Sequence, residues 1–268
     1  MKRMKFLGAA GTVTGSSYWL MDSDNKGILV DLGLFQGVEE PKIFDNERLY
    51  FEARDLTGVV LTHAHLDHCG RLPLLVQAGY TGPIYMTEAT RQLLELSLFD
   101  SAKVMAESEQ RRGERKALFS EEEVEKLLLL CRVVHYDKSF TVGNFEITLR
   151  DAGHILGSAS VEVVDKREGF GPKKIVFSGD LGNTPQDLIR PTTPIIEAEL
   201  VVMESTYGDR THGGEDAVKV LTEEINAVEA SGGTLLIPAF SLERTQEILH
   251  KIDHLKKNWD TIRVTHFA

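Results

Sequence analysis

The sequence predicts a layered α/β protein, and three observations carry that prediction. Short runs of β-branched and aliphatic residues recur along the chain, and each ends at a polar, often glycine-containing turn. Segments with helical spacing or helix-capping residues lie between some of these runs. Several runs are apolar throughout, which is typical of strands covered on both faces, so we expect the sheets to lie inside the layers.

The strands follow in order from these runs. The chain is expected to open with a strand that enters the glycine-rich turn Gly8–Ser17, which lacks the Lys-Ser/Thr ending of a phosphate loop. Later strands are expected at Gly27–Val30, Gly58–Leu61, Pro83–Met86, Phe145–Leu149, Ser160–Val164, Lys174–Phe177, Leu200–Met203 and Thr234–Ile237.

Three helices are expected between the strands. The spacing of leucines predicts one from residue 87 to about 104, Ser120 opens a capping box before 124–133, and Ser241 can cap 242–257. The strongly polar stretch Glu107–Lys116 is expected to be a solvated loop or helix end rather than a nucleic-acid contact.

Composition limits the function classes. The 268 residues include 41 acidic and 30 basic side chains, so the formal charge is −11 and a generic basic nucleic-acid binder is excluded. Two cysteines, Cys69 and Cys131, form neither a disulfide framework nor a thiolate zinc pattern, which indicates a reducing cytoplasm. No apolar run approaches the ~18 residues of a membrane span, so no membrane partner is expected.

The most informative segment is His63-Ala-His65-Leu-Asp67-His68, which directly follows an expected strand. In an extended loop, alternate residues project to the same side, so His63 and His65 can hold one ion while Asp67 and His68 turn toward a second. Imidazole and carboxylate suit zinc. Three histidines and an aspartate within six residues, in a chain with nine histidines, therefore predict a metal site rather than a polar turn.

Two further strands end in ligand-capable residues. The run at 145–149 leads to His154, and the run at 174–177 leads to Asp180. Functional side chains gather at loops beyond the strand ends of α/β sheets, so these residues can join the histidine cluster. His154 would complete a three-histidine set, and Asp180 could bridge two metals.

These residues resemble the metal motifs of the metallo-β-lactamase superfamily. The resemblance implies an αββα sandwich with two zinc ions at one edge. It also places Asp31, at the end of the run Ile28–Asp31, as an aspartate that supports the ligand loop from behind.

Further segments resemble the β-CASP branch, which includes ribonuclease J and the cleavage-and-polyadenylation endonuclease. They are Gly8–Ser17, Asp31–Gly37, Gly153–Ala159, Leu200–Arg210 and Ile237–Gln246. The resemblance implies an RNA substrate and gives Glu204 the place of the branch's motif A acid. As a simpler alternative, Glu204 is a carboxylate at the end of a strand.

The resemblance also predicts the domain organisation and one departure. A metallo-β-lactamase domain is expected over 1–210 and an incomplete β-CASP domain over 211–268. The branch carries two more histidines, motifs B and C, beyond this chain's last residue, and His250, His254 and His266 match neither context. Whether the chain is a fragment or naturally truncated stays open, as does the oligomeric state, a homodimer included.

The resemblance implies hydrolysis of a phosphodiester by metal-activated water. His63, His65 and His154 would hold one zinc, and His68 and Asp180 the other. Asp67 would orient or deprotonate the nucleophile, and Glu204 would organise the motif B histidine. Two alternatives remain: a hydrolase of a small ester, thioester or lactam, and a non-catalytic scaffold of an RNA-processing complex, although scaffolds of this branch tend to have degraded zinc ligands.

Overall fold

The computed structural model describes residues 3–22, 24–37, 45–112, 116–167, 173–183, 187–211 and 216–255. The chain folds as two compact units. One comprises Met1–Thr184 with Ile189–Glu204, and the other comprises Pro185–Leu188 with Ser205–Ala268. No helix in the described ranges is both long and apolar enough to cross a membrane.

The first unit contains two sheets. The first has the order β1-β2-β3-β4-β5-β6, antiparallel as far as β3 and parallel from β3 to β6. Its strands are β1 (Arg3–Phe6), β2 (Tyr18–Met21), β3 (Gly27–Val30), β4 (Leu56–Val60), β5 (Ile84–Met86) and β6 (Cys131–Val133).

The second sheet has the order β11-β10-β9-β8-β7. All its pairings are antiparallel except β10 with β11, which is parallel. Its strands are β7 (Phe140–Val142), β8 (Phe145–Asp151), β9 (Ala159–Asp165), β10 (Lys174–Phe177) and β11 (Leu200–Val202).

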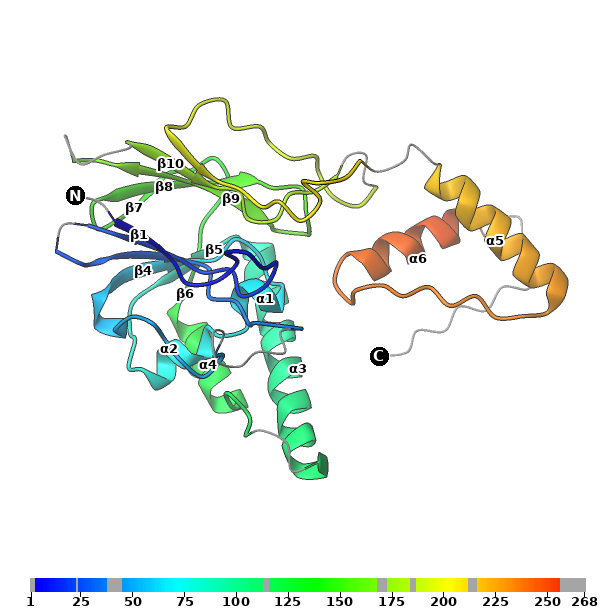
Figure 1. Cartoon of the computed structure of the whole chain (residues 1–268), viewed down its shortest axis with the longest axis horizontal. Helices are drawn as coiled ribbons and strands as arrows, with labels where there is room; N and C mark the ends of the chain where they lie inside the picture. Colours follow the sequence, from blue (N-terminus) through cyan, green and yellow to red (C-terminus); the bar gives the residue numbers. More distant parts are fainter. Residues whose placement is uncertain are drawn as a thin grey trace. The chain divides into compact units, whose positions relative to one another are not determined.

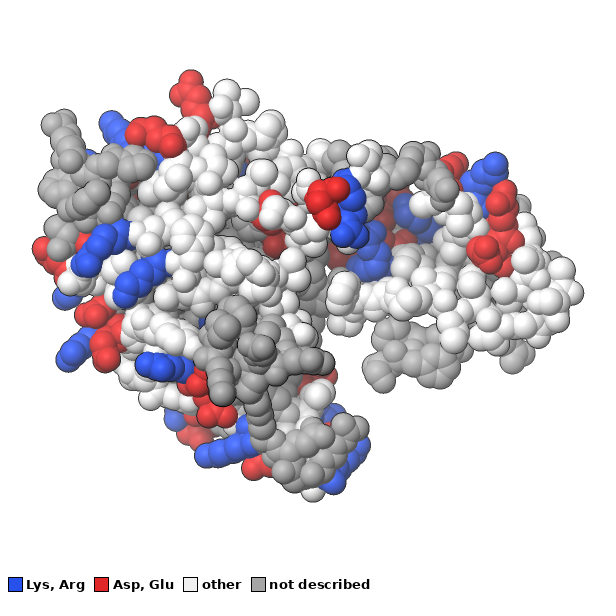
Figure 2. All heavy atoms as spheres, in the orientation of Figure 1, with Lys and Arg blue, Asp and Glu red and all other residues white. Residues whose placement is uncertain are grey.

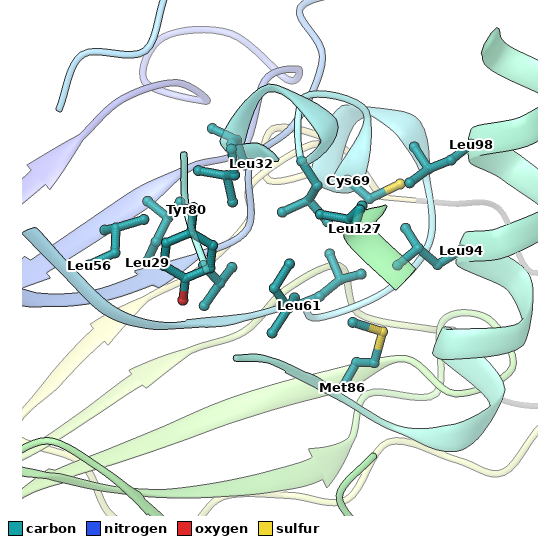
Figure 3. Packing of buried hydrophobic residues seen from close by; sticks show 14 of the residues in the cluster. Leu29, Leu32, Leu56, Leu61, Cys69, Tyr80, Met86, Leu94, Leu98 and Leu127 are labelled. Atoms are coloured by element: carbon teal, nitrogen blue, oxygen red, sulfur yellow. The ribbon is translucent and has the colours of Figure 1, made fainter. Parts of the chain in front are cut away.

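Helices cover one face of the first sheet (Figure 1). They are α1 (Leu66–Cys69), α2 (Pro73–Gln77), α3 (Glu88–Arg112) and α4 (Glu121–Leu130), with a short 3-10 helix, η1 (Ala53–Asp55). Leu94 and Leu98 of α3 and Leu127 of α4 pack there against strand residues such as Leu29 and Met86 (Figure 3).

The other face of the first sheet packs on the second sheet. Ile28, Val30 and Val60 are fully buried against Val161 and Phe177 of the second sheet. Adjacent residues of β3 and β4 thus point into different cores, which is why these strands are apolar throughout. The predicted sandwich is confirmed for its helix, sheet and sheet layers. Within the described part of this unit, every helix belongs to the first sheet's layer.

The other unit contains α5 (Ala217–Ser231) and α6 (Arg244–Leu255). Asp216 caps α5 by accepting hydrogen bonds from the amides of Val218 and Lys219. On α6, the buried Glu247 carboxylate accepts from the amides of Asp187 and Leu188 and so holds that short segment in the unit.

The structure corrects some of the predicted elements. Thr234–Ile237 forms no strand, because the described part of its unit offers no strand to pair with and the run stays largely exposed. The helix expected over 124–133 is α4, which begins at the predicted capping box but ends at Leu130, where Cys131–Val133 pairs with β5. The third helix begins at Arg244 rather than after Ser241, and α3 runs into the polar stretch as far as Arg112.

Candidate metal centre

The predicted ligands lie in loops that follow strands of both sheets. His63 and His65 follow β4 of the first sheet. His154 follows β8 and Asp180 follows β10, both of the second sheet. The sandwich brings the four residues together, and one ligand atom from each lies within 4.8 Å of the others.

The three histidines form a compact nitrogen cluster. Nδ1 of His65 lies 3.1 Å from Nε2 of His63 and 3.2 Å from Nε2 of His154. Oδ2 of Asp180 lies 3.7 Å from the His63 nitrogen and 3.6 Å from the His154 nitrogen. Four ligands at 2.0–2.1 Å from one ion in a tetrahedron are about 3.3 Å from each other, so these separations fit zinc coordination.

A second group shares Asp180. Asp67 and His68 of α1 and Asp180 each offer a ligand atom within 4.8 Å of one another. Nε2 of His68 lies 3.0 Å from Oδ1 of Asp180, while Oδ2 of the same carboxylate faces His63 and His154. Asp180 is therefore placed to bridge two positions, and the two groups together contain all six predicted ligands.

Asp31, to which the family resemblance assigns a supporting role, lies behind this arrangement and contacts His68. Its buried carboxylate accepts hydrogen bonds from the Thr62 amide at 2.8 Å and the Thr62 hydroxyl at 2.7 Å. It also lies 2.7 Å from Nδ1 of His68. That bond directs Nε2 of His68 toward Asp180, because the two ring nitrogens lie on opposite sides of the imidazole.

Burial and the mutual charges of the cluster shift its pKa values in opposite directions. Burial, reinforced by the neighbouring imidazoles, lowers the pKa of His63 well below its ordinary value. For His68 burial acts the same way, but Asp31 and Asp180 outweigh it and raise the pKa well above the ordinary value. Burial lowers the pKa of His154 to about 4. Burial would raise the pKa of Asp180, yet His68 and the other histidines hold it at about 2.

The burial of Asp67 raises its carboxyl pKa, with His68 opposing that shift. The backbone of this residue is also fixed: its carbonyl accepts from the Ser16 amide at 2.9 Å. A Cβ on Gly33 would lie 1.5 Å from that same carbonyl, so only glycine permits the Asp31 loop to approach the ligand loop. The Gly33 amide donates to the Ser16 carbonyl at 2.9 Å, so the glycine-rich turn, the Asp31 loop and α1 are hydrogen-bonded together.

Glu204 lies just beyond β11, next to the Asp180 loop. Its Oε1 accepts from the Leu181 amide at 2.8 Å, and its own amide donates to the Ser178 hydroxyl at 3.1 Å. These bonds join the segment on either side of Asp180 to the end of β11. The structure places Glu204 beside the centre but outside both groups of ligand atoms.

Sequence reasoning missed several supporting residues. Arg71 is buried; its Nε donates to the Gly33 carbonyl at 2.6 Å, and its guanidinium lies 4.5 Å from the Phe35 ring centroid. Burial lowers the pKa of Arg71 to about 10. Thr62 was also missed. The position of these residues directly beside the histidine motif was the only signal available.

A family model for the metallo-beta-lactamase superfamily matches residues 11–206 of the chain. The chain belongs to the metallo-beta-lactamase superfamily. The match covers both sheets' ligand loops, which agrees with the residues that the sequence singled out and the structure brings together.

The chain matches several relatives that are longer than itself. It is 40% identical over 245 residues to ribonuclease TTHA0252 of Thermus thermophilus, covering 91% of this chain and 53% of the relative. It is 32% identical to RNase aCSPSF2 of Saccharolobus solfataricus and 29% identical to transcription termination factor FttA of Methanocaldococcus jannaschii, covering 47% and 38% of them. The chain thus spans about half or less of these relatives.

Proposed function

We propose that this chain contributes the metal centre of a zinc-dependent ribonuclease of the β-CASP branch. The observation that carries the proposal is the paired ligand set, in which Asp180 stands between a three-histidine group and the Asp67–His68 group. Relatives named as ribonucleases over this same region support RNA as the substrate class.

The proposal gives each residue of the set a task. His63, His65 and His154 would hold one zinc, and Asp67 and His68 the other, with Asp180 between them. When bound, two such ions acidify water and neutralise the charge that develops on phosphate oxygens. Asp67 would take up the proton of the attacking water, and Asp31 would keep His68 in the tautomer that presents Nε2.

The charge of the molecule limits how the substrate is held. On the face drawn in Figure 2, Lys and Arg side chains lie interspersed with Asp and Glu. With a formal charge of −11 over the whole chain, the surface gives little long-range attraction for a polyanion. We therefore expect local contacts near the metal centre to supply most of the binding energy for RNA.

The domain assignment is part of the same proposal. Residues 1–210 would form the metallo-β-lactamase domain and residues 211–268 the beginning of a β-CASP domain. The chain passes from the first structural unit to the second between Glu204 and Ser205, close to the proposed boundary. Under this assignment, the motif B and C histidines that a complete active site needs would lie in a region that corresponds to the additional length of the relatives.

Single-turnover cleavage of a labelled single-stranded RNA tests the function. We expect weak cleavage by the 268-residue chain and efficient, chelator-sensitive cleavage by a version extended through motifs B and C. Misplacement of groups in the reaction can cost ~100-fold, which sets the expected difference. The extended Asp67→Ala variant should lose cleavage. An extended chain that hydrolyses a small ester but leaves RNA intact would refute the ribonuclease proposal.

A further inference from the structure

The three histidines of the proposed zinc position come from different sheets, so the contacts that join the sheets determine how far apart they lie. His63 and His65 follow β4, whereas His154 lies in the loop 152–158 between β8 and β9. A zinc ion requires its ligands within about 0.2 Å of the ideal distance. Contacts that hold the loop 152–158 against the first sheet's layer should therefore affect the affinity of the proposed site for zinc.

That loop is closed internally by Ser158. The Ser158 hydroxyl, which is fully buried, accepts from the amides of His154 at 3.0 Å and Ile155 at 3.2 Å. The Ser158 carbonyl accepts from the Tyr136 hydroxyl at 2.7 Å. The backbone that carries His154 is thus held as one turn, and any displacement of Ser158 or Gly157 moves the histidine with it.

The turn is attached to the start of α3, through Thr87 just before the helix and Thr90 in its first turn, and α3 belongs to the other layer. The hydroxyl oxygens of Thr87 and Thr90 lie 2.7 and 2.8 Å from the Gly157 carbonyl oxygen and 3.0 Å from each other, so each hydroxyl can donate to that carbonyl. Thr90 is fully buried and Thr87 nearly so. Gly157 has φ +86°, and a Cβ there would lie 2.5 Å from the Thr90 amide nitrogen, so glycine is required for this approach.

We propose that Thr87 and Thr90 are positioning residues for the metal centre, which hold His154 at its distance from His63 and His65 through the Gly157 carbonyl. The inference rests on the proposed metal site. The inference gives the start of α3 a positioning role in addition to the packing of this helix in the core. Both hydroxyls lie against one carbonyl oxygen in a buried place, so the attachment fixes the direction of that carbonyl as well as its distance from α3.

The chain offers a matched control for this bond. Thr57 donates its hydroxyl to the Gly27 carbonyl at 2.9 Å, the same chemistry at nearly the same length. That bond joins the beginnings of β3 and β4, whereas the histidines follow the end of β4. Thr57→Val and Thr90→Val therefore each remove a threonine hydroxyl that donates to a backbone carbonyl, and only Thr90 lies next to a loop that carries a proposed ligand.

The test measures metal binding of the full 268-residue chain. Zinc affinity is determined by competition with a chromogenic chelator, Co²⁺ absorption reports the coordination geometry, and thermal unfolding without metal reports stability. We expect Thr90→Val to weaken binding at the three-histidine position about 10–100-fold and to alter the Co²⁺ spectrum. Thr90→Ser, which keeps the hydroxyl, should restore both. Thr57→Val, which removes a hydroxyl from a half-buried place, should lower the unfolding midpoint while leaving both unchanged.

The outcomes separate this inference from the function on which it rests. Wild-type zinc binding together with unchanged affinity in Thr90→Val overturns the positioning role and leaves the metal centre intact. Absence of zinc binding by the wild-type chain overturns the metal centre and this inference with it. If Thr90→Val does not fold, Thr87→Val, which removes the other donor, is measured in the same way, and wild-type affinity in it overturns the inference.

Discussion

The replacement of Asp31 by asparagine tests how the proposed second metal position is built. The carboxylate accepts three hydrogen bonds, from the Thr62 amide, the Thr62 hydroxyl and Nδ1 of His68. Asparagine has nearly the same shape and tolerates the φ of 58° at this position, so the backbone should remain in place. It offers one acceptor oxygen and one amide group that can only donate.

The expected magnitude follows from the geometry. If the amide group of the new side chain faces His68, Nδ1 must accept, and the proton moves to Nε2, the nitrogen that faces Asp180. If the side chain turns over, its amide group opposes the Thr62 N–H instead. The first arrangement places the proton on the nitrogen that would bind the ion, and the second leaves the buried Thr62 N–H without its acceptor, at a cost of roughly 1–3 kcal/mol. We expect zinc affinity at the second position to fall about 10–100-fold, with the three-histidine position retained.

Stepwise zinc titration against a competing chelator measures the two positions separately. Asp22→Asn is the control, because Asp22 is also buried and accepts from two amides, those of Asp24 and Lys26, but precedes β3 whereas Asp31 follows it. Two equivalents of zinc bound by Asp31→Asn with wild-type affinity would refute the reasoning. An equal loss in Asp22→Asn would show that general destabilisation causes the effect.

Three further results are expected. Zinc should raise the thermal unfolding midpoint of the wild-type chain, and His65→Ala should abolish the tighter binding phase in the same titration, because one of three nitrogen ligands is removed. Burial alone would raise the pKa of Glu162, but hydrogen bonds from Lys174 and Arg150 outweigh burial and lower that pKa. The ion pairs of Glu162 therefore stabilise the folded state above the unfolded-state pKa of ~4.3, and this stabilisation is lost as the pH falls through the lower pKa of the folded state. The unfolding midpoint should thus fall more steeply in acid for wild type than for Glu162→Gln, and equal slopes would contradict this. Limited proteolysis should cut first near 210–215, a polar glycine-containing segment largely outside the described residues, and earlier cutting inside 174–180 would contradict the proposed domain boundary.

The ligand loops were predictable because their residue types are rare and their spacing is short. Four of the proposed ligands lie within the six residues His63–His68. His154 and Asp180 each follow a recognisable strand. These features are local, and the structure confirms that they converge in space.

The supporting contacts were less accessible to sequence reasoning. Thr90 and Gly157 are 67 positions apart, and neither residue type is unusual in its segment. The failed strand at Thr234–Ile237 has the same origin: an apolar run specifies a strand only when a neighbouring strand is available to satisfy its backbone. Pairing between distant segments, rather than local propensity, decided both cases.

The participation of both sheets in one nitrogen cluster gives a bound ion a second effect. His65 and His154 are 89 positions apart, so a shared zinc would act as a cross-link that closes a long loop of the chain. Both cysteines are free thiols, and Cys69 is buried, so the described chain contains no covalent cross-link of its own. Metal uptake would then reduce the rate at which the two layers separate, and a chelator would act as a denaturant as well as an inhibitor.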